Sequence, residues 1–229
     1  MTMGMKDPYL MRYQYQLWRF ICPVFLHGDV MHLFSNVVAQ LMIGSSLEAD
    51  IGSLRFMALY MLSGFGGILF SICCSDMRSM GASTAVYGLV GAYLSFMILN
   101  WGYLSNNPEK KCQIILFICL SLFLSVMLGT QNIDVLGHLG GFLTGSLVAL
   151  FLLPGLGTAP SDLQHQRRCK NFGLMSSITL ALVFLVVFYT LREPGADAET
   201  AGSLSLTDNA LEPEDNDAIA TTEGEGVEE

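Results

Sequence analysis

Residues 81–101, GASTAVYGLVGAYLSFMILNW, join a long apolar run to a hydroxyl group near its start. About 20 apolar residues are what an α-helix needs to cross a hydrocarbon core of roughly 30 Å. Ser83 and Tyr87 are four residues apart, so both project from one face of the predicted helix. Small residues lie on that face and on the opposite one, which predicts a helix packed on two sides at the centre of a bundle.

The composition predicts a membrane protein. Of 229 residues, 52% are hydrophobic and 14% charged, and the mean hydropathy is +0.50. A soluble domain would carry roughly 25% charged residues. Besides 81–101, apolar runs of spanning length cover residues 30–47, 54–75, 112–129, 135–153 and 174–191. We therefore expect an all-α, polytopic membrane helical bundle with about six transmembrane helices.

The runs divide the chain into five regions. We expect a polar segment at 1–17, a core of one loop and five spans at 18–153, a basic loop at 154–173, an additional membrane helix at 174–192, and an acidic tail at 193–229. The tail has twelve acidic residues and no Lys or Arg, a composition typical of disorder. It also sets the net charge of −9, and no basic patch indicates binding to nucleic acid.

The Lys and Arg residues of the short connectors predict the orientation. Six of them fall on one side of the predicted spans, and this side is expected to be cytosolic: Arg55, Lys110, Lys111, Arg167, Arg168 and Lys170. The spans at 30, 81 and 135 then begin at the lumenal or exterior side. We expect a multi-pass protein of the secretory pathway or plasma membrane.

Four polar residues lie at similar depth near the starts of these spans: His32, Asn36, Ser83 and His138. Polar side chains are expensive to bury in lipid and often mark a functional site. Each has an ordinary explanation when taken alone, because a lone Ser bonds its own helix and a lone His or Asn can join two helices. Four polar residues at the same predicted depth favour a shared functional site.

Glycines indicate how these residues meet. Gly141 and Gly145 share a helix face with His138, and small residues let helix backbones approach closely. This face is therefore expected to press against the Ser83 face of the span at 81–101.

A serine beside a histidine suggests nucleophilic catalysis. Ser is a weak nucleophile until a base takes its proton, and His138 is the candidate base. No carboxylate lies in a predicted span, so we expect a dyad, with Tyr87 stacked on the imidazole, in place of an Asp-completed triad. His32, Asn36 and the Ser83 N–H are the candidate donors to an oxyanion.

Five motifs, in this order, resemble those of the rhomboid intramembrane serine proteases over roughly residues 18–150. They are Trp18-Arg19, His27-x4-His32-x3-Asn36, Glu48 with Gly52, Gly81-x-Ser83 with Tyr87, and Gly137-His138-x2-Gly141-x3-Gly145.

The resemblance implies that Ser83 is the nucleophile and His138 the general base of an intramembrane serine endopeptidase. It implies that His32, Asn36 and the Ser83 amide form the oxyanion hole. It also implies supporting roles: Tyr87 packs on the catalytic His, Gly81 gives the substrate room, Trp18 and Arg19 belong to a membrane-dipping loop, and Glu48 anchors the cytosolic loop region.

The same resemblance implies the partners. Family substrates are single-pass transmembrane proteins, cut within or near the lumenal end of their spans where small or helix-breaking residues let the chain unwind. The lipid bilayer is the other expected partner, and no cofactor or metal is expected.

Two departures keep an alternative open. Position 84 is Thr where many relatives have Gly, and no apolar span precedes Trp18, so the five core spans match the family's second to sixth. The second departure makes a catalytically inactive, rhomboid-like scaffold the alternative function, while Thr84 leaves the dyad intact. A transporter or a zinc site built from His27, His32 and His138 is disfavoured, since neither repeated halves nor adjoining Cys or carboxylate ligands occur.

Overall fold

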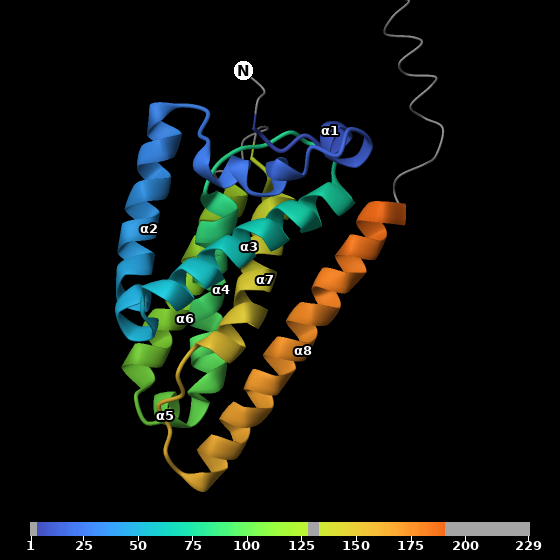
Figure 1. The fold of residues 1–229 in the computed structure, drawn as a ribbon. Helices are drawn as coiled ribbons and strands as arrows, with labels where there is room; N and C mark the ends of the chain where they lie inside the picture. The colour runs from blue at the N-terminus through green and yellow to red at the C-terminus, as the bar shows by residue number, and fades with distance from the viewer. Residues whose placement is uncertain (1–3, 128–132, 191–229) are drawn as a thin grey trace, which may run out of the picture. The chain divides into compact units, whose positions relative to one another are not determined.

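The computed structural model describes residues 4–127 and 133–190, and Figure 1 shows them folded into helices. In chain order these are α1 (Pro8–Tyr13), the short 3-10 helices η1 (Leu17–Phe20) and η2 (Cys22–Phe25), α2 (Val30–Ile51), α3 (Ser53–Cys74), α4 (Ser83–Leu99), α5 (Trp101–Ser105), α6 (Pro108–Met127), α7 (Val135–Leu152) and α8 (Pro160–Thr190). The predicted acidic tail at 193–229 lies outside the described residues.

The predicted helical bundle is confirmed, and side-chain caps explain where two of its helices begin. The Asp29 carboxylate accepts a hydrogen bond from the His32 N–H, 2.8 Å away, at the start of α2. The Asp134 carboxylate does the same for the Gly137 N–H, also at 2.8 Å, at the start of α7. Such caps satisfy backbone donors that have no partner within the helix. Gly52, with φ of 81°, ends α2 and turns the chain into α3.

The segment predicted as a basic loop at 154–173 is helical from residue 160 onward, because α8 begins there and continues to Thr190. Hydropathy detects lipid-facing residues, and a polar helix outside the lipid escapes it. Pro160 at the first position and Asp162 in the first turn favour a helix start. Gln166 is buried and donates to the Gly157 carbonyl at 3.0 Å, which ties this polar turn to the preceding loop.

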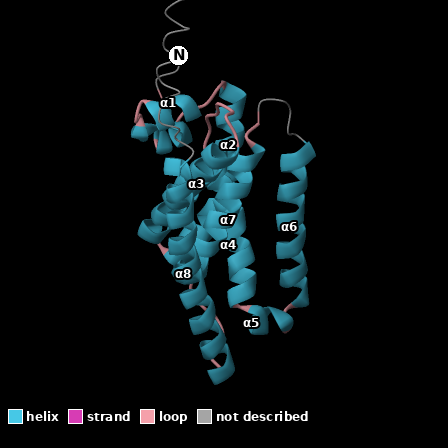
Figure 2. Cartoon of the chain, turned by 90° about the vertical axis from the view of Figure 1, so that its right-hand side faces the viewer, coloured by secondary structure: helices cyan, strands magenta, loops and turns pink. Residues whose placement is uncertain are grey.

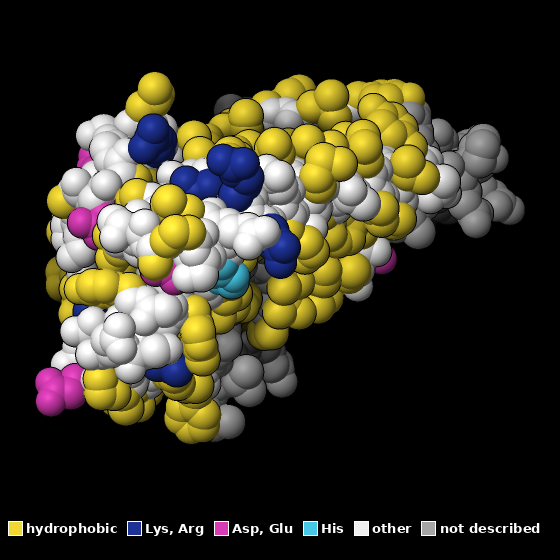
Figure 3. All heavy atoms as spheres, turned by 90° about the horizontal axis from the view of Figure 1, so that it is seen from below, with side chains coloured by type: hydrophobic (Ala, Val, Ile, Leu, Met, Phe, Trp, Pro, Cys, Tyr) yellow, Lys and Arg dark blue, Asp and Glu magenta, His cyan; other side chains and the backbone are white. Residues whose placement is uncertain are grey.

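The protein is a multi-pass membrane protein. Among the described residues, four helices are long and apolar enough to cross a bilayer, namely α2, α3, α7 and α8, while α4 is apolar but shorter. Only 11% of the apolar window of α8 is buried, so this helix presents its side chains to lipid. Figure 3 shows hydrophobic side chains covering the flank of the molecule.

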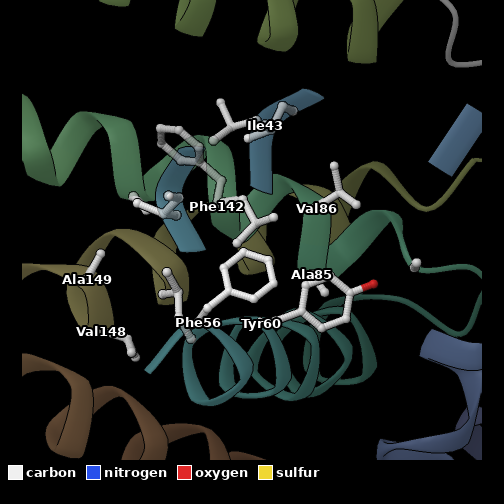
Figure 4. Close-up of a cluster of buried hydrophobic side chains, with 14 of the residues drawn as sticks. Ile43, Phe56, Tyr60, Ala85, Val86, Phe142, Val148 and Ala149 are labelled. Carbon is white, nitrogen blue, oxygen red and sulfur yellow. The ribbon is translucent and has the colours of Figure 1, made fainter. Parts of the chain in front are cut away.

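Helix α4 is the centre of the bundle and packs against both α3 and α7, which also pack against each other. Figure 4 shows side chains from these three helices in one cluster, including Phe56, Tyr60, Val86 and Phe142. Helix α6 packs chiefly on α4 and stands at one side in Figure 2. The central position expected from the small residues of α4 is therefore present.

Residues 4–13, which we call the strap, pack onto the end of the bundle where α2 begins (Figure 1). Met11 is fully buried there. Lys6 pairs with Ser79 in the loop before α4, through backbone bonds of 2.8 and 3.2 Å. The strap is thus part of the folded bundle.

Candidate active site

Ser83 and His138 meet where α4 and α7 begin. Ser83 is the first residue of α4, and His138 lies in the first turn of α7. The Ser83 Oγ and the His138 Nε2 are 2.8 Å apart, which is hydrogen-bonding distance. Only 9% of His138 is exposed, so little water competes for this contact.

Glycines on α7 make this meeting possible. A Cβ atom added to Gly141 would lie 2.0 Å from the Thr84 carbonyl oxygen, and one added to Gly145 would lie 2.3 Å from the Gly88 carbonyl oxygen. No side chain fits at such distances, so the two backbones touch directly. The predicted close approach of the His138 face to α4 is present.

Tyr87 lies flat against the imidazole. The Tyr87 and His138 rings are stacked with their centroids 4.4 Å apart and their planes at 16°. The Tyr87 hydroxyl donates to the Ser121 carbonyl of α6 at 3.1 Å. Tyr87 therefore restricts the imidazole orientation and is itself held by a third helix.

A cavity of about 450 Å³ opens in front of this pair. It brings together six of the residues singled out in the sequence: His32, Asn36, Gly81, Ser83, Tyr87 and His138. The other supporting residues lie elsewhere. Trp18 is 52% exposed on η1, and Arg19 is buried and donates to the Met5 carbonyl at 2.7 Å. Glu48 lies in the last turn of α2, where its carbonyl accepts from Gly52.

Two of the candidate oxyanion donors, His32 and Asn36, lie on the α2 side of the cavity. The Asn36 Nδ2 donates to the carbonyl of His32, one turn earlier, at 2.8 Å. A Cβ on Gly81 would lie 2.8 Å from the His32 Nε2, and Gly81 has φ of 138°. Both the space and the backbone conformation therefore require glycine at position 81.

His27 is a neighbour that the sequence reasoning did not place in the site. The Ala82 N–H donates to the His27 Nε2 at 3.4 Å, and the His27 and His32 rings meet edge to face at 5.2 Å. Burial, together with nearby His32, lowers the pKa of His27. The neutral ring can therefore accept this bond and steady the backbone just before Ser83. The five-residue spacing from His32 was the available signal.

Thr84, the larger residue noted in the sequence, does not disturb the dyad contact. Its side chain is buried against glycines of two helices: a Cβ on Gly67 of α3 would lie 3.0 Å from the Thr84 Cβ, and one on Gly137 of α7 would lie 3.1 Å from its Cγ2. The Thr84 hydroxyl has no hydrogen-bond partner among the described residues. These glycines provide the room for the larger residue.

Asp134 anchors a buried polar network that the sequence reasoning missed. Its carboxylate accepts bonds from Lys6 at 2.7 Å, from Ser79 at 2.8 Å, and from Ser71 at 2.7 and 2.8 Å. Burial opposes its ionisation, but the Lys6 charge and the bonds from Ser71 and Gly137 hold the pKa of Asp134 below its usual value. Its place four residues before His138, as a helix cap, was the only local signal.

This network predicts acid sensitivity. A carboxyl whose pKa is lowered by folding stabilises the protein above its unfolded pKa of about 4, and this stabilisation is lost as the pH falls through the folded value. We expect the unfolding temperature in detergent to drop below about pH 4, and Asp134→Asn to weaken that dependence. At neutral pH the variant should lose about 3 kcal/mol, since it leaves the buried Lys6 unpaired. An unchanged acid profile in Asp134→Asn would contradict this.

In the part of the chain that the structure describes, no three His, Cys, Asp or Glu side chains gather so that they could hold a metal ion.

Comparison with known proteins gives a consistent result. A family model described as the Rhomboid domain matches residues 14–155. RHOMBOID-like protein 5 of Arabidopsis thaliana is 39% identical over 195 residues, covering 77% of this chain and 62% of the relative. RHOMBOID-like protein 4 of the same plant is 39% identical over 137 residues, covering 59% and 34%.

A third relative is Rhomboid-like protease 1 of Toxoplasma gondii, which is 35% identical over 160 residues, covering 69% of this chain and 54% of the relative. The chain thus spans between about a third and two thirds of the length of these three proteins.

Proposed function

This chain belongs to the rhomboid family, and from that premise we propose that it is a serine endopeptidase that cleaves single-pass transmembrane proteins in the membrane. The observation that carries the proposal is the 2.8 Å contact between the Ser83 Oγ and the His138 Nε2. An alcohol in this contact can lose its proton as it attacks a carbonyl carbon. The word protease in the name of the Toxoplasma relative also supports it.

The reaction needs one imidazole to act twice. As the Ser83 Oγ bonds to the scissile carbonyl carbon, the His138 Nε2 takes its proton. The resulting imidazolium gives that proton to the leaving amine nitrogen, which breaks the peptide bond and leaves an acyl-enzyme. A water molecule, deprotonated by the same imidazole, then attacks the acyl carbon, releases the acid and restores Ser83.

Donors on α2 and α4 stabilise the tetrahedral intermediate in this proposal. His32, Asn36 and the Ser83 N–H border the same cavity as the nucleophile. Asn36 donates one amide hydrogen to its own helix at rest, and the second hydrogen of the same NH2 group is the one that would donate to the oxyanion when charge develops. A donor that strengthens only in the transition state lowers the barrier for the chemical step.

Asn36→Ala is therefore expected to lower kcat by about 100-fold with little change in KM, because it removes one oxyanion donor. Cleavage kinetics in proteoliposomes measure both constants. Asn107→Ala is the matched control, because the Asn107 Nδ2 also donates to a carbonyl four residues earlier, at 2.9 Å, in the exposed connection between α5 and α6. A kcat within twofold of wild type for Asn36→Ala would remove Asn36 from the oxyanion hole.

The charge distribution supports a cavity that faces the lumen or exterior. Lys110 and Lys111 begin α6, and Arg167, Arg168 and Lys170 lie in the polar first half of α8. Figure 3 views the molecule from the end opposite the strap and shows Lys and Arg side chains on that face. Basic connectors remain in the cytosol, so the dyad would meet water and substrate from the other side, in the secretory pathway or at the plasma membrane.

The direct test is cleavage in liposomes of a single-pass protein that carries a helix-breaking residue near the lumenal end of its span. We expect one cut close to that residue, located by sequencing the new N-terminus. If the purified, folded protein leaves a panel of such substrates intact, the inactive scaffold becomes the better description.

A further inference from the structure

All three ion pairs among the described residues tie the strap to the loops that lead into α4 and α7. Lys6 pairs with Asp134 at 2.7 Å, Arg12 with Asp76 at 2.8 Å, and Asp7 with Arg78 at 2.7 Å. If ion pairs were scattered over the surface at random, they would not all have one member in the strap. This concentration indicates that the strap holds a particular part of the molecule in place.

Lys6 is completely buried, and its ion pair is the one of the three with both members buried, because Asp76 and Arg78 are exposed in the other two. Its Nζ donates to the Ser71 Oγ at 2.5 Å and to the Asp134 carboxylate at 2.7 Å. Removing an ammonium group from water is costly, and a buried ion pair adds little net stability over apolar packing. Such pairs are better suited to fixing one arrangement of the segments that they join.

The segments joined here carry the two reactive groups. On one side, Ser79 bonds to Asp134 at 2.8 Å and pairs with the Lys6 backbone, four residues before Ser83. On the other, Asp134 caps α7 through Gly137, and its carbonyl accepts the His138 N–H at 3.0 Å. Lys6 therefore lies where the segment that leads to Ser83 meets the segment that leads to His138.

We propose that Lys6 is a positioning residue, which, through Asp134 and Ser79, holds the starts of α4 and α7 in the register that brings Ser83 to His138. The inference rests on the proposed function for its catalytic consequence, while the ordering of the two loops stands independently. Lys6 touches neither reacting group and acts only by fixing the loops. A misplacement of about 1 Å in such a pair can cost on the order of 100-fold in rate.

The test combines two measurements on the full chain in nanodiscs. The first is the rate at which a small fluorophosphonate reacts with Ser83, which reports the dyad geometry without a bound substrate. The second is amide hydrogen exchange of residues 75–82 and 135–138, measured in a Ser83→Ala background so that no chemistry is involved. Lys6→Met should slow phosphonylation by about 10- to 100-fold and speed exchange in both segments.

Two further variants separate positioning from general stability. Asp76→Asn removes the charge of the largely exposed partner of Arg12, and such an exposed pair contributes little, so this variant should change the phosphonylation rate by less than about threefold. The double variant Lys6→Met with Asp134→Asn leaves no unpaired buried charge, and it should fold yet remain slow. The phosphonylation rate of the double variant should fall by less than the two single variants' losses combined, because both residues act through one contact.

The outcomes are distinct. If Lys6→Met and the folded double variant react as fast as wild type, the positioning role is overturned, whatever the protein cleaves. If wild type itself does not react, the proposed protease function fails, but faster exchange in Lys6→Met would still establish that Lys6 orders these loops. Unchanged exchange in both segments would overturn the inference even then.

Discussion

Cleavage of a single-pass substrate is expected to fall by at least about 1,000-fold in Ser83→Ala, to the limit of detection. The variant removes the oxygen that forms the acyl-enzyme and leaves only the cavity and its amide donors. Because the Ser83 side chain makes one hydrogen bond to the described residues, the 2.8 Å bond to His138, folding should be unaffected. Product formation in proteoliposomes and the unfolding temperature measure the two effects separately.

His138→Ala should produce a loss of the same order, and the double variant should be no worse than either single one. Residues that act as one unit show such non-additive losses. Ser121→Ala is the matched control, since Ser121 lines the same cavity but donates to its own helix at 2.8 Å. Full activity in Ser83→Ala, or a comparable loss in Ser121→Ala, would refute the assigned nucleophile.

Gly141→Ala should have the largest structural effect of any single methyl group in the bundle core. The added carbon would lie 2.0 Å from the Thr84 carbonyl oxygen, and neither backbone can move without separating α4 from α7. Alanine favours a helix by about 1 kcal/mol over glycine, but overpacking typically costs 1–3 kcal/mol and more against a backbone. We expect net destabilisation of about 2 kcal/mol, together with loss of cleavage as His138 moves away from Ser83.

Gly102→Ala is the comparison, because its added carbon would meet only the flexible end of the Asp162 side chain, at 2.8 Å. Thermal unfolding in detergent and substrate cleavage should both remain near wild type in this variant. If Gly141→Ala unfolds at the wild-type temperature and cleaves normally, the direct contact between the α4 and α7 backbones is not what brings the two reactive groups together.

The sequence predicts most of the membrane bundle because span length and buried polar residues leave local signals. Ser83, His138 and Asn36 stand out as polar groups in apolar runs, and the glycines beside His138 mark the face that touches α4. These signals depend on spacing within one helix, which a sequence displays directly.

What the sequence does not predict depends on distant partners. Lys6 and Asp134 are 128 residues apart, and neither belongs to an apolar run, so nothing local marks them as a buried pair. The polar first half of α8 was missed because hydropathy reports contact with lipid and not helix formation. Nothing in the sequence around Thr84 indicates that glycines on α3 and α7 make room for its side chain.

The most direct test of the central claim, that His138 activates Ser83, is to map the fluorophosphonate adduct by mass spectrometry of the intact protein in nanodiscs. We predict one adduct, on the Ser83 oxygen, whose formation is slowed by at least about 1,000-fold in His138→Ala. An adduct on any other residue, or one that forms on Ser83 equally fast without the imidazole, would contradict the account.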